Sequence, residues 1–274
     1  MSIKKRYFLL SIGFIPLLLS LCAIDLTQAI FSEKMSLEKG ANKAATAVTL
    51  AKSFLGNDYV SHTIEQTPER LVCNLKGFDC YTFVESVLAM ANTRHHAKTY
   101  LQFQMKLRQM RYREGIIDGY GSRLHYFLEW KQQGEAQGLF TDITAQLGGS
   151  KIQPTIHFMA SHRALYPALE DEVAFQTIQS VEKKLSNTPW FFIPKNKVAD
   201  IEDDLQEGDI IGITSGVDGL DFNHEGFVTK KARRAYLLHA SSEVKKVVIA
   251  AEPLADYLQR VKKHTGIVVL RIRD

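Results

Sequence analysis

The stretch LKGFDCYTFVESVLAMA, residues 75–91, places a single cysteine where a turn changes into a helical pattern. Gly77 interrupts the preceding segment, and Asp79 has the short polar side chain that favours a helix N-cap. The apolar residues that follow recur at the spacing of one helix face: Val84, Val87, Leu88 and Ala91. The pattern therefore predicts a helix whose first turn contains Cys80.

The first turn of a helix is a chemically distinctive place for a thiol. The helix dipole and the free backbone N–H groups favour a thiolate, and the same N–H groups can receive an oxyanion. Cys80 is thus a candidate nucleophile. The alternative for an exported protein is a disulfide with Cys73, seven residues earlier. A domain of this length can build a large core without a bridge, so we expect Cys73 not to pair with Cys80.

A nucleophilic cysteine needs a base, and the base needs a partner that orients it. Residues 205–243 contain three strand patterns, IIGI, HEGFV and AYLLHAS, separated by polar turns. These patterns predict an antiparallel meander that brings His224 and His239 side by side on one face. His224 could then take the thiol proton while His239 holds its ring in one tautomer. The alternative for each histidine alone is a structural role in the core or at a sheet edge.

The first residues predict export. The basic start MSIKKR precedes an apolar run over residues 8–24 and a small-residue pattern that ends at Ala29. We expect a signal peptide over residues 1–29, cleavage after Ala29 and a periplasmic location. An uncleaved anchor helix fits less well, because the apolar run is short and contains Pro16.

Charge and motifs argue against several classes of protein. The 274 residues carry a formal net charge of +4, which removal of residues 1–29 reduces to +2. A charge so near neutral gives no reason to expect nucleic acid as a partner. The chain has no HExxH motif and its histidines lack metal-ligand spacing, so a zinc amidase is the weaker alternative. We expect no metal or other cofactor, and no stable membrane span after cleavage.

Four short motifs in order resemble the NlpC-type papain-like cysteine hydrolases of bacterial cell walls: FDCYTFVE, LQEGDIIGI, NHEGFV and LLHASS. The resemblance implies that Cys80 is the nucleophile, His224 the base and His239 the polar third member. It also implies an α+β fold in which the nucleophile helix packs on an antiparallel sheet. The segment FLGNDYV resembles the part of the family that carries a tyrosine near the oxyanion, which makes Tyr59 a near-site candidate together with Asn74.

Longer motifs resemble the N-acetylmuramoyl-L-alanine amidase branch of this superfamily: RYREGIIDGYGSRLHYFLEW, HFMASHRALYP and GLDFNHEGF. This resemblance implies a peptidoglycan or muropeptide substrate, cleaved between the lactyl group of N-acetylmuramic acid and L-alanine. Within these motifs Ser122, Arg123, His125 and Asp221 are candidates for binding substrate. The alternative for the first three is a solvated turn, while the aromatic residues after them have the spacing of a core helix face.

The interval between Cys80 and His224 is much longer than in compact members of the superfamily. Residues 95–113 read as a long helix, and residues 195–206 as a charged surface connection. No Pro-, Gly- or Ser-rich linker divides the chain, so we expect one elaborated domain over residues 30–274. Two other functions remain open: an endopeptidase of the same fold that cuts the stem peptide after γ-D-glutamate, and a non-catalytic wall-binding protein.

Overall fold

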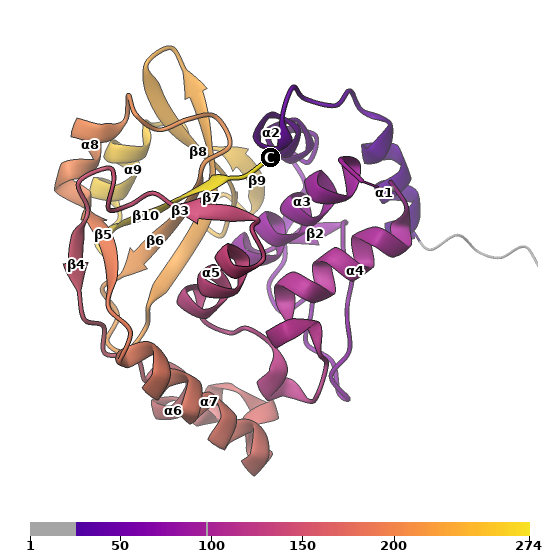
Figure 1. Cartoon of the computed structure of the whole chain (residues 1–274), viewed down its shortest axis with the longest axis vertical. Coiled ribbons are helices and arrows are strands. Elements are labelled where there is room, and N and C mark those ends of the chain that lie inside the picture. Colours follow the sequence, from indigo (N-terminus) through magenta and orange to yellow (C-terminus); the bar gives the residue numbers. More distant parts are fainter. Residues whose placement is uncertain (1–25, 97) are drawn as a thin grey trace, which may run out of the picture.

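The computed structural model describes residues 26–96 and 98–274. Its helices are α1 (Leu26–Ser36), α2 (Lys43–Lys52), α3 (Cys80–Arg94), α4 (Tyr100–Arg111), α5 (Phe127–Ala136), α6 (Phe158–Ser161), α7 (Glu172–Ser186), α8 (Val198–Ile201) and α9 (Leu254–Arg260). Its strands are β1 (Asp58–Tyr59), β2 (Gly77–Phe78), β3 (Phe140–Asp142), β4 (Ser150–Ile152), β5 (Trp190–Pro194), β6 (Ile210–Ser215), β7 (Phe222–Lys231), β8 (Arg234–Ser241), β9 (Lys246–Ile249) and β10 (His264–Ile272). The fold is therefore α+β, as the sequence predicts (Figure 1).

The strands form one sheet in the order β2-β1-β9-β8-β7-β6-β10-β5-β4, with β3 paired to β10. Strands β6, β7 and β8 are consecutive antiparallel neighbours, so the predicted meander over residues 205–243 is confirmed. The parallel pair β1 and β2 extends the sheet at one edge through β9. Because β2 leads directly into α3, this edge also sets where the nucleophile helix begins.

Both faces of the sheet are covered. On one face α3 packs against Phe227 and Leu238, within a core that extends into α1, α2, α4, α5, α6 and α7. On the other face α8 and α9 cover a second core that contains Val228 and Leu237 (Figure 1). Alternate residues of β7 and β8 thus point to opposite cores, as the period of a strand requires. Every residue of α3 from 82 to 93 is buried, which makes α3 the central helix of the fold.

The start of α3 is fixed by its own side chains. The Thr82 backbone N–H donates to Asp79 Oδ1 at 2.7 Å, and the Asp79 N–H donates to Thr82 Oγ1 at 3.0 Å. This reciprocal capping box satisfies two backbone donors at the helix end. The predicted N-cap at Asp79 is confirmed, and Cys80 is the first residue of the helix.

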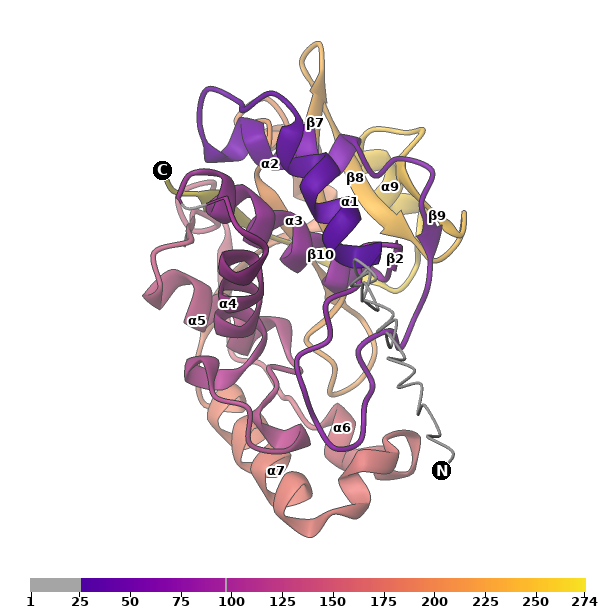
Figure 2. The ribbon, with the colours of Figure 1, turned by 90° about the vertical axis from the view of Figure 1, so that its right-hand side faces the viewer.

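The residues between α3 and β6 contribute to both layers. The helix predicted over residues 95–113 is present as α4, and Figure 2 shows it lying beside α3. Strands β3, β4 and β5 of the same region extend the sheet beyond β10. Residues 195–206 differ from the predicted surface connection, because they contain α8 and bury Val198 and Leu205 in the second core.

Most of the predicted signal peptide, residues 1–25, lies outside the described residues. The predicted cleavage point after Ala29 falls within α1. A membrane-spanning candidate would need a long apolar helix, and none occurs among the residues that are described.

Gly212 tests how closely the helical layer approaches β6. A Cβ atom at this position would lie 2.4 Å from Phe127 Cζ and 2.9 Å from Phe222 Cε1. Gly212→Ala should therefore lower the free energy of unfolding by about 1–3 kcal/mol through overpacking. Gly216→Ala is the matched control, because its nearest contact would be a milder 3.3 Å. Urea unfolding of both variants measures the difference, and an equal loss in both would contradict the packing described.

Candidate active site

Cys80 lies where the first turn of α3 meets β7. The backbone N–H groups of Tyr81 and Glu225 are hydrogen-bonded to its sulfur, and Glu225 directly follows His224. The residue as a whole is partly exposed, whereas the sulfur has a buried environment. Cys73 and Cys80 are not joined by a disulfide. The thiol is therefore held against the strand that carries the candidate base.

His224 on β7 and His239 on β8 are hydrogen-bonded to each other. His224 Nε2 lies 2.5 Å from His239 Nδ1, and the two rings meet edge to face. Gly226 makes this approach feasible, because a Cβ atom there would lie 2.9 Å from His239 Cβ. The bond occupies Nε2 of His224, so Nδ1 is the ring nitrogen left for another partner. The structure thus brings together the two histidines that the sequence pairs.

The electrostatics of Cys80 and His224 favour the uncharged form of both side chains at rest. Burial raises the pKa of the Cys80 thiol, and the nearby carboxylate of Asp79 adds to the increase. Burial also lowers the pKa of His224, with a further contribution from His239. The sequence predicts a thiolate favoured by the helix dipole, but burial and Asp79 outweigh that effect. The resting site therefore holds a thiol and a neutral imidazole.

Tyr59 places a phenol near the sulfur. It lies on β1, and burial raises its pKa to about 12, with Cys80 and Asp79 as further causes. The Lys245 ammonium lies 5.4 Å from the centre of its ring. Tyr59 is therefore a protonated donor within electrostatic reach of Cys80, as an oxyanion-binding residue must be.

Asn74 supports the turn before β2. Its Nδ2 donates to the Gly77 carbonyl at 3.1 Å, and its Oδ1 accepts from the Lys76 N–H at 3.0 Å. Both polar groups of the side chain are thus engaged by the backbone. Asn74 shapes the segment that leads to Cys80, which is a supporting role.

Ser122 and Arg123 are also occupied within the protein. Ser122 Oγ donates to the Gly119 carbonyl at 2.7 Å. The Arg123 side chain is almost fully buried, and its Nη2 lies 2.9 Å from both carboxylate oxygens of Glu65. Its guanidinium also stacks over the Tyr120 ring. These contacts engage both side chains within the protein, and the direct substrate contact expected of them stays a prediction.

Asp221 holds the start of α5. Its Oδ2 accepts from the Leu128 N–H at 2.9 Å, and its Oδ1 accepts from the Phe222 N–H at 2.7 Å. The residue is 5% exposed, and burial raises its pKa to about 7. Its carboxyl therefore joins α5 to the beginning of β7, and its predicted contact with substrate stays a prediction.

His125 differs from these residues because it lines a cavity of about 640 Å³. Figure 2 shows the loop after β1 running toward α6 and the segment before α7, the regions that enclose this cavity. Its walls include His62, three residues after Tyr59, and Leu220, four residues before His224. The cavity walls thus continue the chain segments that carry the candidate site. Tyr120, Tyr126 and Tyr166 make its lining strongly aromatic.

A second cavity, of about 510 Å³, opens beside His239 and Tyr257. The Tyr257 ring lies 5.5 Å from the ring of His239 and 5.5 Å from that of His264. His264, 2% exposed, begins β10, and its ring is nearly parallel to that of His224 at 6.5 Å. Sequence reasoning missed both Tyr257 and His264. A histidine opening an apolar strand, KKHTGIVVL, was the available signal for the latter.

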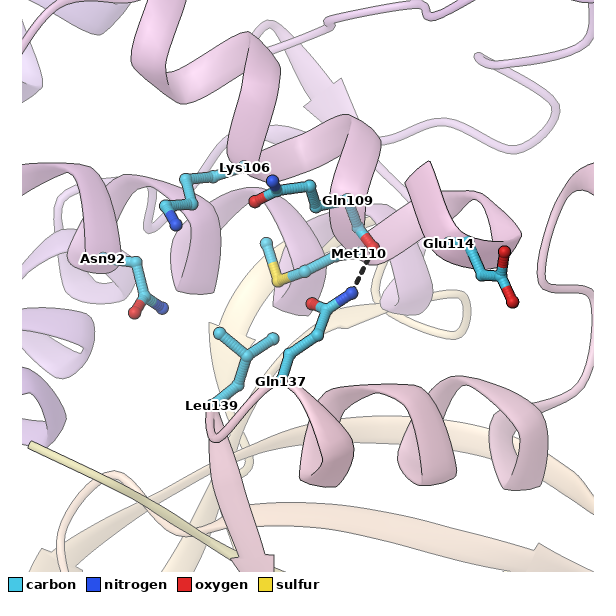
Figure 3. Close-up of a pocket in the computed structure, with 7 residues that line it drawn as sticks. All are labelled: Asn92, Lys106, Gln109, Met110, Glu114, Gln137 and Leu139. Carbon is cyan, nitrogen blue, oxygen red and sulfur yellow. Dashed lines mark hydrogen bonds between the residues drawn. The ribbon is translucent and has the colours of Figure 1, made fainter. Parts of the chain in front are cut away.

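A smaller cavity of about 270 Å³ lies away from this centre (Figure 3). It lies between the later part of α3, α4 and the end of α5, where Gln137 Nε2 donates to the Gln109 carbonyl at 2.9 Å. Asn92 in its wall is twelve residues after Cys80, about 18 Å along an α-helix. None of the predicted site residues lines this cavity. In the part of the chain that is described, no group of three His, Cys, Asp or Glu side chains could hold a metal ion.

Comparisons with known proteins converge on one family. Residues 49–267 match the family model AmiA-like, described as N-acetylmuramoyl-L-alanine amidase-like. A solved N-acetylmuramoyl-L-alanine amidase from Bacteroides uniformis is 35% identical, with a TM-score of 0.79 over 85% of this chain and 99% of that one. A solved Bacteroides fragilis protein named a putative xylanase is 36% identical, with a TM-score of 0.76 over 81% and 98%. A search of curated proteins gives no match.

A more distant solved structure shares the fold alone. It is a Legionella pneumophila protein with 19% identity and a TM-score of 0.64, over 91% of this chain and 94% of that one.

The range matched by the family model includes Tyr59, Cys80, His224 and His239.

Asp79→Asn tests the balance of charges around the sulfur. Asparagine caps helices as well as aspartate does, so α3 should still begin at Cys80. Loss of the carboxylate removes one cause of the raised pKa of Cys80. The rate of alkylation by iodoacetamide, followed against pH, should therefore rise at lower pH than in the unmodified protein. Circular dichroism checks the fold, and an unchanged or opposite alkylation profile would contradict the electrostatics described.

Proposed function

The chain belongs to the N-acetylmuramoyl-L-alanine amidase-like family, and from this premise we propose that it is a cysteine hydrolase acting on peptidoglycan fragments. The bond it cleaves joins the lactyl group of N-acetylmuramic acid to L-alanine. The observation that carries the cysteine mechanism is the hydrogen bond between His224 and His239, because His224 lies on β7, the strand that contacts the Cys80 sulfur. The amidase named for the Bacteroides uniformis relative supports the choice of bond.

The proposed reaction begins from the neutral pair. His224 accepts the thiol proton through Nδ1 as the Cys80 sulfur attacks the amide carbonyl carbon. The resulting oxyanion is held by the Cys80 backbone N–H and the Tyr59 hydroxyl. His224 then gives its proton to the nitrogen of L-alanine, the C–N bond breaks, and a thioester remains on the enzyme. Water, deprotonated by His224, hydrolyses the thioester and releases the muramic carboxylate and the thiol.

His239 contributes by orienting the base. With its Nδ1 accepting from His224 Nε2, it selects the His224 tautomer whose Nδ1 is unprotonated. Burial lowers the pKa of His239 to about 4, so its Nδ1 carries no proton at neutral pH and can accept this bond. The role parallels the polar third member of other cysteine and serine hydrolases.

We also propose the NlpC-type papain-like architecture for the chain. It is supported by a nucleophile at the start of a buried helix, packed against an antiparallel meander that carries both histidines. A single domain over residues 30–274 is supported by one core that contains both Phe31 and Ile272. The enlarged region after α3 is then an elaboration of that domain.

The aromatic cavity of about 640 Å³ is the proposed binding site for the muropeptide. Tyrosine rings and the neutral imidazole of His125 offer flat surfaces and hydrogen-bonding groups of the kind that recognise ligands in concave sites. Burial, followed by the charge of Arg123, lowers the pKa of His125 to about 3, so it stays uncharged. Ser122 and Arg123 shape the wall of this site through Gly119 and Glu65.

A peptidoglycan substrate is consistent with export of the protein. The basic and apolar pattern over residues 1–29 supports removal of a signal peptide and delivery to the periplasm, where peptidoglycan lies. Sequencing the N-terminus of protein recovered from the periplasm tests this proposal. Retention of residues 1–29 in that material would overturn the cleavage site.

The mechanism predicts unequal losses in the three site variants. Cys80→Ala should abolish turnover, because no other group forms the thioester. His224→Ala should lose at least about 100- to 10,000-fold, since acid–base catalysis is removed along with activation of the thiol. His239→Ala should lose less, and His239→Asn should recover part of that loss because its amide oxygen can accept from His224. Steady-state kinetics on one muropeptide, with the fold checked by circular dichroism, measures all four.

Product masses identify the bond. Release of the intact stem peptide supports the amidase, whereas an L-alanyl-D-glutamate stub left on the sugar identifies an endopeptidase. Binding of muropeptide without any turnover would identify a non-catalytic wall-binding protein. Near-normal activity in folded Cys80→Ala would overturn the cysteine mechanism.

A further inference from the structure

Glu225 lies directly behind the nucleophile, on the face of β7 opposite to His224. Strand alternation puts Glu225 on the same side as Phe227, whose ring meets Phe83 of α3 at 6.0 Å. Glu225 is 4% exposed, and its backbone N–H is hydrogen-bonded to the Cys80 sulfur. A carboxyl group is thus buried between the sheet and the first turns of the nucleophile helix.

The basic groups nearby are already engaged by other carboxylates. Arg111 on α4 donates through Nε and Nη2 to Glu85 Oε2 at 3.0 and 2.9 Å, and both side chains are fully buried. Its Nη1 donates to the Val72 carbonyl at 2.5 Å. Arg123 is paired with Glu65. The buried guanidinium of Arg111 therefore neutralises the buried carboxylate of Glu85.

Glu225 itself has no such partner. Among residues 26–96 and 98–274, its buried Oε2 atom makes no hydrogen bond. The groups that face it are Asp79, Tyr81 and Glu85 at the start of α3 and Asp221 before β7, so the charged neighbours are negative. Burial raises the pKa of Glu225 well above its ordinary value, and the carboxyls of Glu85, Asp79 and Asp221 raise it further. An unpaired charge at this position would be strongly unfavourable.

We propose that Glu225 is a positioning residue of the hydrolase, an uncharged carboxylic acid that fills the space behind Cys80 and leaves the negative charge of the site to the sulfur. This proposal rests on the cysteine mechanism given above. Two buried oxygens on α3, Tyr81 Oη and Glu85 Oε1, also lack hydrogen-bond partners among the described residues. Either oxygen could accept a hydrogen bond from a protonated Glu225 carboxyl. A neutral Glu225 keeps its backbone N–H on the sulfur without opposing formation of the thiolate.

Alkylation of Cys80 against pH distinguishes a neutral Glu225 from a charged one. Replacing a neutral acid by an amide changes no charge, so Glu225→Gln should move the alkylation midpoint by less than about half a pH unit. Asp79→Asn is the matched control, because it removes a carboxylate beside the same sulfur and should shift the midpoint to lower pH. A shift in Glu225→Gln as large as that in Asp79→Asn would show that Glu225 is charged, and would overturn the proposal.

Infrared spectra give a second measurement that needs neither substrate nor activity. Protein labelled with ¹³C in its glutamate carboxyls should show a protonated carboxyl band at neutral pH, which disappears in Glu225→Gln and persists in Glu38→Gln, an exposed control. Absence of the band from the unmodified protein overturns the proposal even if the variant does not fold.

Kinetics then test the positioning role. Glu225→Gln should retain more activity than Glu225→Ala, because the amide fills the same space and can still hydrogen-bond. Equal losses in both folded variants would overturn the role. A failure of the cysteine mechanism would instead be seen as activity in Cys80→Ala, whereas the charge of Glu225 is read from the spectra independently.

Discussion

The contact between the first turn of α3 and β7 is the constraint on which the rest of the site depends. The capping box of Asp79 and Thr82 fixes where the helix begins, and the hydrogen bond from the Glu225 N–H fixes where its first side chain lies. A helix starting one residue later would place Cys80 outside the helix and turn the sulfur away from the strand. Because α3 is buried along residues 82–93, that position is enforced by the whole core.

The same contact explains the protonation state of the site. Burial disfavours both the thiolate and the imidazolium, so neither charge exists in isolation at rest. In the proposed mechanism the two charges form together, when the proton moves from Cys80 to His224. In the proposed tautomer His224 Nε2 donates to His239, which leaves Nδ1 of His224 ready for that transfer. The proposed reactivity therefore depends on coupled proton transfer more than on a preformed thiolate.

Local patterns predicted the parts of this site that lie close together in sequence. The N-cap, the helix that begins at Cys80 and the meander with its two histidines all follow from short-range spacing. The raised pKa of Cys80 was not predicted, because burial depends on the packing of segments far along the chain. The partners of Arg123 and Asp221 were also out of reach of local patterns, because Glu65 and Leu128 lie 58 and 93 residues away in the sequence. Nothing local distinguishes a buried ion pair or a helix cap from a residue that binds substrate.

In the proposed function the residues of chemistry and those of recognition lie in different parts of the chain. The proposed chemistry uses the start of α3 and two adjacent strands, β7 and β8, whose geometry the core fixes. The aromatic cavity is instead formed mainly by loops and by the region inserted between α3 and β6. Loops tolerate change better than a buried helix or a central strand does. Substrate choice can thus vary through the inserted region while the contact between α3 and β7 is kept, provided that Asp221 continues to join α5 to the strand that carries His224.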